Sequence, residues 1–269
     1  MSSKRNLPIH KYPRTQHIEG SRLQPGDEDL ESVPFDQIAG RHLVVEEKVD
    51  GANSAISFTG NGELLLQSRG HYLTGGRRER HFDLLKKWGH SHAAALREVL
   101  RDRFVMYGEW LYARHTIFYN DLPHYFMEFD VLDRKDGVFL STDRRLLLLK
   151  DLPVVSVEVL HSGALENLKK LTELIGDSHF IRHGHLDELR QICRRLGVDH
   201  ELTIGETDPS KTMEGLYVKV EEDGEVAERH KFIRPSFLTA VLESGSHWME
   251  RPIIPNQLCQ GIDIFEANL

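Results

Sequence analysis

Ionisable side chains recur near the ends of apolar, strand-like segments, and this pattern constrains the chain more than any other. The five residues are Arg69 after LLLQS, Glu109 after FVMYG, Asp130 after FMEF, Glu214 after KTM and Lys231 after ERH. An ionised group in a buried strand costs free energy unless it is paired or lies in a solvated cleft. Because all five lie near strand ends, we expect the strands to converge on one polar site.

The spacing of apolar residues predicts strands joined by short turns. The predicted strand segments are HLVVEEKVDG, SAISFTGNGELLLQSRG, FVMYGEWLY, YFMEFDVLD, MEGLYVKVEEDG and VAERHKFIR. Gly60-Asn61-Gly62 and Asp223-Gly224 are typical hairpin turns. The first 40 residues are rich in proline and glycine and predict an extended loop with one short strand.

Helical spacing predicts the remaining elements. Helices are expected over 81–101, 142–151, 165–197 and, as a last helix-like piece, PSFLTAVLESG at 235–245. We expect the helix at 165–197 to be broken around 176–184. Together the elements predict an α+β fold of mostly antiparallel sheets with flanking helices. We expect one domain, 1–269, with a helical insertion at about 163–200.

Composition restricts the class of protein. The 269 residues are 39% hydrophobic, enough for a sizeable core, and the net charge of −8 argues against a protein that coats nucleic acid through a bulk positive field. No apolar stretch reaches the roughly 20 residues of a membrane span, and the start lacks the apolar core of a signal peptide. With only two cysteines, Cys193 and Cys259, a reducing cytoplasmic location is expected. The spacing of the 16 histidines lacks the framework of a zinc site.

The string Lys48-Val49-Asp50-Gly51 is the sharpest local motif. By itself it would occur by chance in about one chain in twenty of this length, and a surface lysine in a turn would explain it. The five ionisable strand positions that follow it change this interpretation. They make Lys48 a candidate covalent site.

The order of motifs resembles the covalent nucleotidyltransferase superfamily of polynucleotide ligases and mRNA capping enzymes. It is most similar to ATP-dependent RNA ligases of the phage RNA ligase 2 type. The motifs that carry the resemblance are EEKVDGAN, SRG, GEW, MEFDVLD, EGLYVKV and ERHKFIRPSF. They extend from roughly Tyr12 to Phe237. The resemblance implies the nucleotidyltransferase fold, an ATP-grasp-like ligase domain.

The resemblance implies that Lys48 attacks the α-phosphate of ATP and becomes adenylylated. It places Glu47 and Asp50 beside the adenylate, and it lets Asn53 hold metal water or phosphate. Strand alternation puts Lys48 and Asp50 on one face with Glu46, and Glu47 on the other. Which of the two glutamates faces the nucleotide is left open by alternation, and the resemblance favours Glu47.

The same resemblance assigns the later motifs. Arg69 contacts phosphate or ribose oxygens and the 5′-phosphate of the strand to be joined, and Glu109 accepts from the ribose hydroxyls. Phe129 stacks on adenine, although Phe126 and Phe139 compete for this role.

The last two motifs supply metal and phosphate contacts. Glu214, together with Asn53, binds Mg²⁺ or Mn²⁺, and Lys231 neutralises the α-phosphate. Where ligases commonly have a lysine this chain has Arg229, whose planar fork differs in geometry. Its role as a second phosphate contact therefore has Arg234 as a rival.

The attacking amine must be neutral, but the acidic residues beside it raise its pKa. Glu46, Glu47 and Asp50 all act in this direction. A bound Mg²⁺ and Lys231 must compensate for them. We therefore expect Lys48 to be inert without a divalent metal.

Length selects among members of the superfamily. The chain ends 35 residues after Arg234, about a third of what a five-stranded OB barrel needs. This favours a compact RNA ligase without an OB domain. We expect it to seal 3′-OH and 5′-phosphate RNA ends in RNA repair. Whether a repair partner protein takes part is left open by the sequence. The alternatives are a DNA-nick ligase or other end-adenylylating enzyme, and a catalytically inactive nucleotide- or RNA-binding module.

Overall fold

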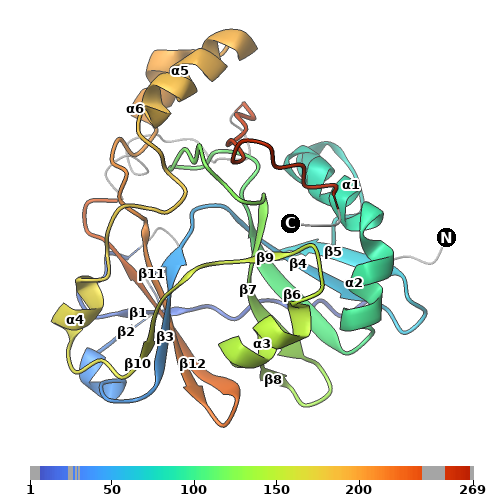
Figure 1. Ribbon diagram of the computed structural model, residues 1–269, viewed down its shortest axis with the longest axis vertical. Helices are drawn as coiled ribbons and strands as arrows, with labels where there is room; N and C mark the ends of the chain where they lie inside the picture. Colours follow the sequence, from blue (N-terminus) through green and yellow to red (C-terminus); the bar gives the residue numbers. More distant parts are fainter. Residues whose placement is uncertain (1–6, 24–26, 28, 30, 238–251, 267–269) are drawn as a thin grey trace.

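Two β-sheets face each other in this protein, with helices on their outer sides (Figure 1). The structure is a computed structural model, and it describes residues 7–23, 27, 29, 31–237 and 252–266. Within these residues the fold is mixed α+β, as the sequence predicted.

The first sheet has the strand order β10-β3-β11-β12-β1-β2. Its strands are β1 (Gln16–Ile18), β2 (Ser32–Val33), β3 (Leu43–Lys48), β10 (Val159–Gly163), β11 (Gly215–Glu222) and β12 (Glu225–Ile233). The pairs β10–β3, β3–β11 and β11–β12 are antiparallel, whereas β1 pairs in parallel with both β12 and β2. The turn between β11 and β12 has positive φ at Asp223 (52°) and Gly224 (81°), as expected of a tight hairpin.

The second sheet has the order β5-β4-β6-β7-β8, and β9 pairs in parallel with β7. Its strands are β4 (Ala52–Phe58), β5 (Leu64–Ser68), β6 (Phe104–Trp110), β7 (Phe126–Asp133), β8 (Val138–Phe139) and β9 (Val155–Ser156). The pairs along this path are antiparallel, so both sheets confirm the predicted mostly antiparallel architecture.

Short helices connect and cover the strands. The α-helices are α1 (Asp83–Ser91), α2 (Ala93–Leu100), α3 (Thr142–Leu149), α4 (Leu168–Thr172), α5 (His185–Leu196) and α6 (His200–Gly205), and the 3-10 helices are η2 (Phe35–Gln37) and η3 (Arg77–Phe82). Figure 1 shows α5 and α6 projecting beyond the sheets. No helix in the described ranges is long and apolar enough to cross a membrane.

Strand alternation gives the first sheet one apolar and one polar face. Leu43, Val45 and their neighbours on β11 pack outward with residues of η2 and α4 in one buried cluster. The intervening residues of β3 and β11, including Glu46, Lys48 and Lys219, face the opposite way, because successive strand residues point to opposite faces. The polar face of this sheet is turned toward the second sheet.

The second sheet is covered on its outer face by α1 and α2. Leu85 and Trp88 of α1 and Leu96 of α2 are fully buried against residues of β4, β5 and β6. The inner face carries polar and aromatic side chains, so the two sheets meet through a mixed interface.

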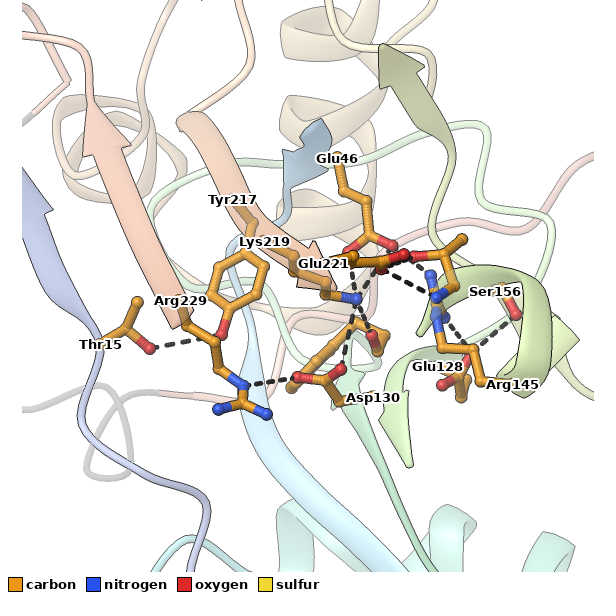
Figure 2. Close-up of polar contacts among 12 residues, drawn as sticks. Thr15, Glu46, Glu128, Asp130, Arg145, Ser156, Tyr217, Lys219, Glu221 and Arg229 are labelled. Atoms are coloured by element: carbon orange, nitrogen blue, oxygen red, sulfur yellow. Dashed lines mark hydrogen bonds and ion pairs between the residues drawn. The ribbon is translucent and has the colours of Figure 1, made fainter. Parts of the chain in front are cut away.

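A buried ion network joins the two inner faces, as Figure 2 shows. Lys219 on β11 lies 3.0 Å from Glu46 on β3 and 3.4 Å from Asp130 on β7. Arg145 on α3 pairs with Glu46 and with Glu128 on β7. These side chains are fully buried. Charges of both signs therefore tie β3 and β11 to β7.

The predicted helix boundaries were partly wrong. The helix predicted over 81–101 divides at His92, whose Nε2 lies 3.2 Å from the carbonyl oxygen of Ile264. The break that the sequence predicted around 176–184 is confirmed, since α4 ends at Thr172 and α5 begins at His185, and α6 follows outside the predicted range. In the segment at 235–245, residues 235–237 form a turn, and 238–245 lie outside the described residues.

Candidate active site

A cavity of about 420 Å³ lies between the inner faces of the two sheets. Nine of the ten predicted site residues line it: Glu47, Lys48, Asp50, Asn53, Arg69, Glu109, Phe129, Glu214 and Lys231. They come from the ends of β3, β4, β5, β6 and β12, from β7, and from the residues beside these strands. The tenth, Arg229, does not line the cavity.

Lys48 ends β3 and enters the cavity beside Glu214, which directly precedes β11. Its Nζ donates to Glu214 Oε2 at 2.7 Å, and its side chain is 23% exposed while that of Glu214 is 1% exposed. Gly215 lets β11 approach β12 here, because a Cβ at this position would lie 1.9 Å from the carbonyl oxygen of Phe232. The pairing of β3 with β11 thus sets Lys48 against Glu214.

Burial acts to lower the pKa of Lys48, but the carboxylates of Glu214 and Glu109 outweigh it and raise this pKa. Asp50 adds to the same effect. Burial raises the pKa of Glu109 to about 8 and that of Glu214 to about 6, although Lys48 acts to lower both. The sequence correctly predicted that acidic residues raise the pKa of Lys48. The strongest causes are Glu214 and Glu109, and of the three residues named from the sequence only Asp50 is among the main causes.

The two glutamates before Lys48 are both held by the protein. Glu46 is fully buried in the ion network with Arg145 and Lys219. Glu47 accepts from Ser178 Oγ at 2.5 Å and from the backbone N–H of His179 at 3.2 Å. Both also line the cavity, so the role of Glu47 at the nucleotide stays a prediction.

Asp50, Asn53 and Arg69 occupy different parts of the wall. Asp50 Oδ2 accepts from the backbone N–H groups of Thr116 and Ile117 at 2.7 and 2.9 Å, so one of its oxygens orders the loop after β6. Asn53 lies opposite Glu109 in the register of β4 and β6. Arg69 is exposed and lines the cavity just after β5.

Phe129 is the one of the three competing phenylalanines that lines the cavity. Its ring meets the ring of Tyr12 edge-on, with centroids 5.2 Å apart. Phe126 is fully buried beside Trp88 in the outer core, and Phe139 packs against Arg229. Stacking of Phe129 on a base stays a prediction, but its two rivals are committed elsewhere.

The basic residues of the last motif separate. Lys231 lines the cavity and donates to Asp27. Arg229 instead donates to Asp130 Oδ2 at 3.1 Å and stacks 3.7 Å from the ring centroid of Phe139. Its rival Arg234 donates to the carbonyl oxygen of Met213 at 2.7 Å and to Asp208, outside the cavity lining. Neither arginine lines the cavity, so a second phosphate contact by either of them stays a prediction.

The fifth ionisable strand residue, Asp130, also lies outside the cavity lining. It accepts from the hydroxyl of Tyr12 and pairs with Lys219 and Arg229, and it therefore belongs to the ion network. Four of the five strand positions converge as predicted, and the fifth is neutralised behind the site.

Sequence reasoning missed several residues of the wall. Tyr12, His71, Phe82 and Tyr217 line the cavity without having been predicted. Tyr217 faces inward because it pairs with Glu46 and Lys231 across its two neighbouring strands. Strand alternation counted from Glu214, three residues away, would have placed it on the opposite face, so this pattern could not have identified it. Tyr12 lies in an irregular segment whose sequence has no periodicity to place it.

The donors at Lys48 fit a divalent cation that is held mainly by phosphate and water. Glu214 is close enough to raise the pKa of Glu109, and Asp50 raises the pKa of both, so the site offers hard oxygen donors with an excess of negative charge. In the described part of the chain no three His, Cys, Asp or Glu side chains form a ready metal cluster. Mg²⁺ typically takes one or two carboxylates and completes its shell with water and phosphate.

A family comparison agrees with this geometry. The RNA ligase family model matches residues 41–233, which contain β3 to β12 and every predicted site residue. The chain belongs to the RNA ligase family. No curated protein sequence matches it.

Solved structures of a Naegleria gruberi RNA ligase share the fold of this RNA ligase family member. A lysine-to-alanine mutant with ATP and Mn matches at a TM-score of 0.52 and 16% identity, and a glutamate-to-alanine mutant with ATP and Mn at 0.52 and 17%. Another glutamate-to-alanine mutant with AMP and Mn matches at 0.51 and 15%. Each match covers 86% of this chain and 57% of the other. The chain thus spans a little over half the length of these relatives.

Proposed function

We propose that this protein is an ATP-dependent RNA ligase of the covalent nucleotidyltransferase superfamily, which carries AMP on Lys48 and seals 3′-OH and 5′-phosphate RNA ends. The observation that carries the proposal is the position of Lys48. Its amine lies in a cavity between two sheets, paired to Glu214, with Lys231, Glu109 and Phe129 in the same wall. Membership of the RNA ligase family supports it.

The first step is proposed to be attack of Lys48 Nζ on the α-phosphorus of ATP. A nitrogen–phosphorus bond forms, the bond to the bridging oxygen breaks, pyrophosphate leaves with the electron pair, and the amine loses its proton. Lys231 would face the charge that develops on the phosphate oxygens. Phe129 would hold the adenine by stacking, typically worth about 1–3 kcal/mol per base.

Glu214 and Asn53 are the proposed metal contacts. Glu214 already serves as the counter-ion of Lys48, at 2.7 Å. A bound Mg²⁺ or Mn²⁺ would supply positive charge that draws this carboxylate away from Lys48 and lowers the pKa of the amine. The Naegleria structures were solved with ATP or AMP and Mn, which supports this choice of substrate and metal.

Two later steps complete the proposed reaction. AMP passes from Lys48 to the 5′-phosphate of one RNA end, and the 3′-hydroxyl of the other end then attacks this phosphate and releases AMP. Arg69, exposed at the cavity wall, is proposed to contact the 5′-phosphate through its forked donors.

Labelling with ATP that carries ³²P in the α-phosphate tests the first step. With Mg²⁺ the wild type should become labelled and Lys48→Ala should not, because the proposal assigns the attacking amine to Lys48. Lys87→Ala is the matched control, since Lys87 is an exposed lysine of α1. A labelled Lys48→Ala protein would remove Lys48 from the mechanism.

A nick-sealing assay tests the substrate. The same duplex is presented with an RNA or a DNA 3′-end at the nick, and the proposal expects faster sealing of the RNA end. Equal or faster sealing of the DNA end would instead support a DNA-nick ligase.

A further inference from the structure

Lys231 is held from behind by a carboxylate of the N-terminal segment. Its Nζ donates to Asp27 Oδ2, and both side chains are almost fully buried, at 9% and 11% exposure. Lys231 lines the cavity whereas Asp27 does not. The carboxylate therefore lies on the far side of the ammonium from the space that a nucleotide would fill.

Asp27 is itself fixed by two further donors. Arg14 Nη2 lies 3.4 Å from its Oδ1, and His17 Nε2 lies 3.3 Å from its Oδ2. His17 is fully buried, and strand β1 places it opposite Lys231 in the register with β12. Both oxygens of Asp27 are therefore committed, and the position of the carboxylate is tied to two neighbouring strands.

The contacts continue back to the strand that carries Lys231. His17 Nδ1 lies 2.7 Å from Ser21 Oγ, and Ser21 Oγ accepts from the backbone N–H of Ile233 at 2.9 Å. A carboxylate can only accept, so His17 Nε2–H donates to Asp27, and in the neutral ring Nδ1 then accepts from the hydroxyl of Ser21. Burial and the nearby Lys231 lower the pKa of His17, in keeping with this neutral ring. The polar chain begins and ends on β12.

We propose that Asp27 is a positioning residue that holds the Lys231 ammonium in place for the phosphate of the bound nucleotide. The inference rests on the proposed function. A free lysine side chain samples many rotamers, and a cation stabilises developing charge best when it is already oriented. Asp27 supplies that orientation without entering the cavity.

The sequence contains a matched control. Asp29 pairs with the same Arg14, at 2.6 Å, but its side chain is 69% exposed, whereas that of Asp27 is 11% exposed and pairs with Lys231. Asp27→Asn and Asp29→Asn therefore make the same chemical change two residues apart. Only Asp27→Asn should change the position of the Lys231 ammonium in the cavity.

The experiment is single-turnover adenylylation of Lys48 with labelled ATP and Mg²⁺. Asp27→Asn is expected to slow the maximal rate about 10-fold to 100-fold while the ATP concentration for half-maximal rate changes little, because Lys231 acts on charge that develops in the transition state. Asp29→Asn should match the wild type. An unchanged maximal rate in Asp27→Asn would overturn the inference. A faster rate, or a lower ATP concentration for half-maximal rate, would also overturn it, because either would mean that Asp27 competes with phosphate for Lys231.

A double-mutant cycle separates positioning from a structural effect. In a Lys231→Met background, Asp27→Asn should slow the reaction no further, because the residue through which it acts is gone. A full additional loss would show that Asp27 acts by another route, and would contradict the inference.

A second variant covers a folding failure of Asp27→Asn. Asp27→Glu keeps the charge but lengthens the side chain, so it should displace the ammonium and slow adenylylation. A wild-type rate in this variant would overturn the inference. If the wild type itself takes no label from ATP, the proposed function fails first, and this outcome is distinct from all of those above.

Discussion

At the residue scale, the candidate site places one amine among carboxyl groups. Glu214 and Glu109 raise the pKa of Lys48 against the effect of burial, so the resting amine is protonated and paired. Its nucleophilic form requires that positive charge be brought to the same carboxylates. Under the proposed function, ATP and a divalent metal would meet this requirement together.

The raised pKa of Glu109 predicts a pH-dependent loss of stability. Between about pH 4.5 and pH 8, glutamate is ionised in the unfolded chain while Glu109 keeps its proton in the folded one. The folded state binds more protons, so stability falls as pH rises through this window. In Glu109→Gln this contribution is absent, and its free energy of unfolding should fall less steeply with pH than that of the wild type.

Urea unfolding of both proteins at a series of pH values, without metal or nucleotide, measures this difference. The free energy of unfolding of Glu109→Gln, relative to that of the wild type, should increase from pH 5 to pH 8. Parallel stability curves would show that Glu109 titrates normally.

Residue type and order were predictable from the sequence, but partners were not. A charge at the end of an apolar strand indicates that something must compensate it, and Arg69, Glu109, Glu214 and Lys231 indeed line one cavity. The charge of Asp130 is also compensated, but inside the protein, where Lys219 and Arg229 pair with it. Both partners belong to strands far along the chain, with Arg229 at a separation of 99 residues from Asp130, and no local sequence pattern reveals them.

At the element scale, α3 connects the two sheets through one side chain. Arg145 is fully buried and pairs with Glu46 of β3 and Glu128 of β7. Ser156 of β9 also donates to Glu128, at 2.7 Å. One arginine therefore balances two carboxylates that belong to different sheets.

Arg145→Met should destabilise the fold by about 3–5 kcal/mol, because it leaves the buried Glu128 without its cation and Glu46 with Lys219 alone. Arg190→Met is the control. Arg190 pairs with the exposed Asp187 within α5, and a pair of this kind contributes about 0–1 kcal/mol. Chemical denaturation of both variants gives the two free energies, and a loss below about 1 kcal/mol in Arg145→Met would mean that the network does not hold the sheets together.

Long, regular elements were predicted better than short ones. β3, β4, β6, β7, β11 and β12 have clear apolar patterns and lie where the sequence placed them. β9 has two residues, and its pairing with β7 has no pattern in the local sequence. The break between α4 and α5 was predicted, but the contact that its residues make was not: Ser178 and His179 donate to Glu47.

At the scale of the whole molecule, the cavity exists because both sheets turn polar faces inward. The sequence predicted the strands and their alternation. How the two sheets pack against each other depends on the buried ion pairs of Lys219 and Arg145, which the sequence did not reveal (Figure 2). The helices α4 to α6 fall in or just beyond the predicted insertion at 163–200, and its standing as an insertion stays a prediction.

The central claim is that Lys48 carries the nucleotide. Peptide mass mapping after incubation with ATP and Mg²⁺ tests it most directly. The account predicts one AMP on the peptide that contains Lys48, formed only when the divalent metal is present. An AMP found on Lys231 or another lysine, or an adduct on Lys48 that forms equally well in a metal chelator, would contradict the account.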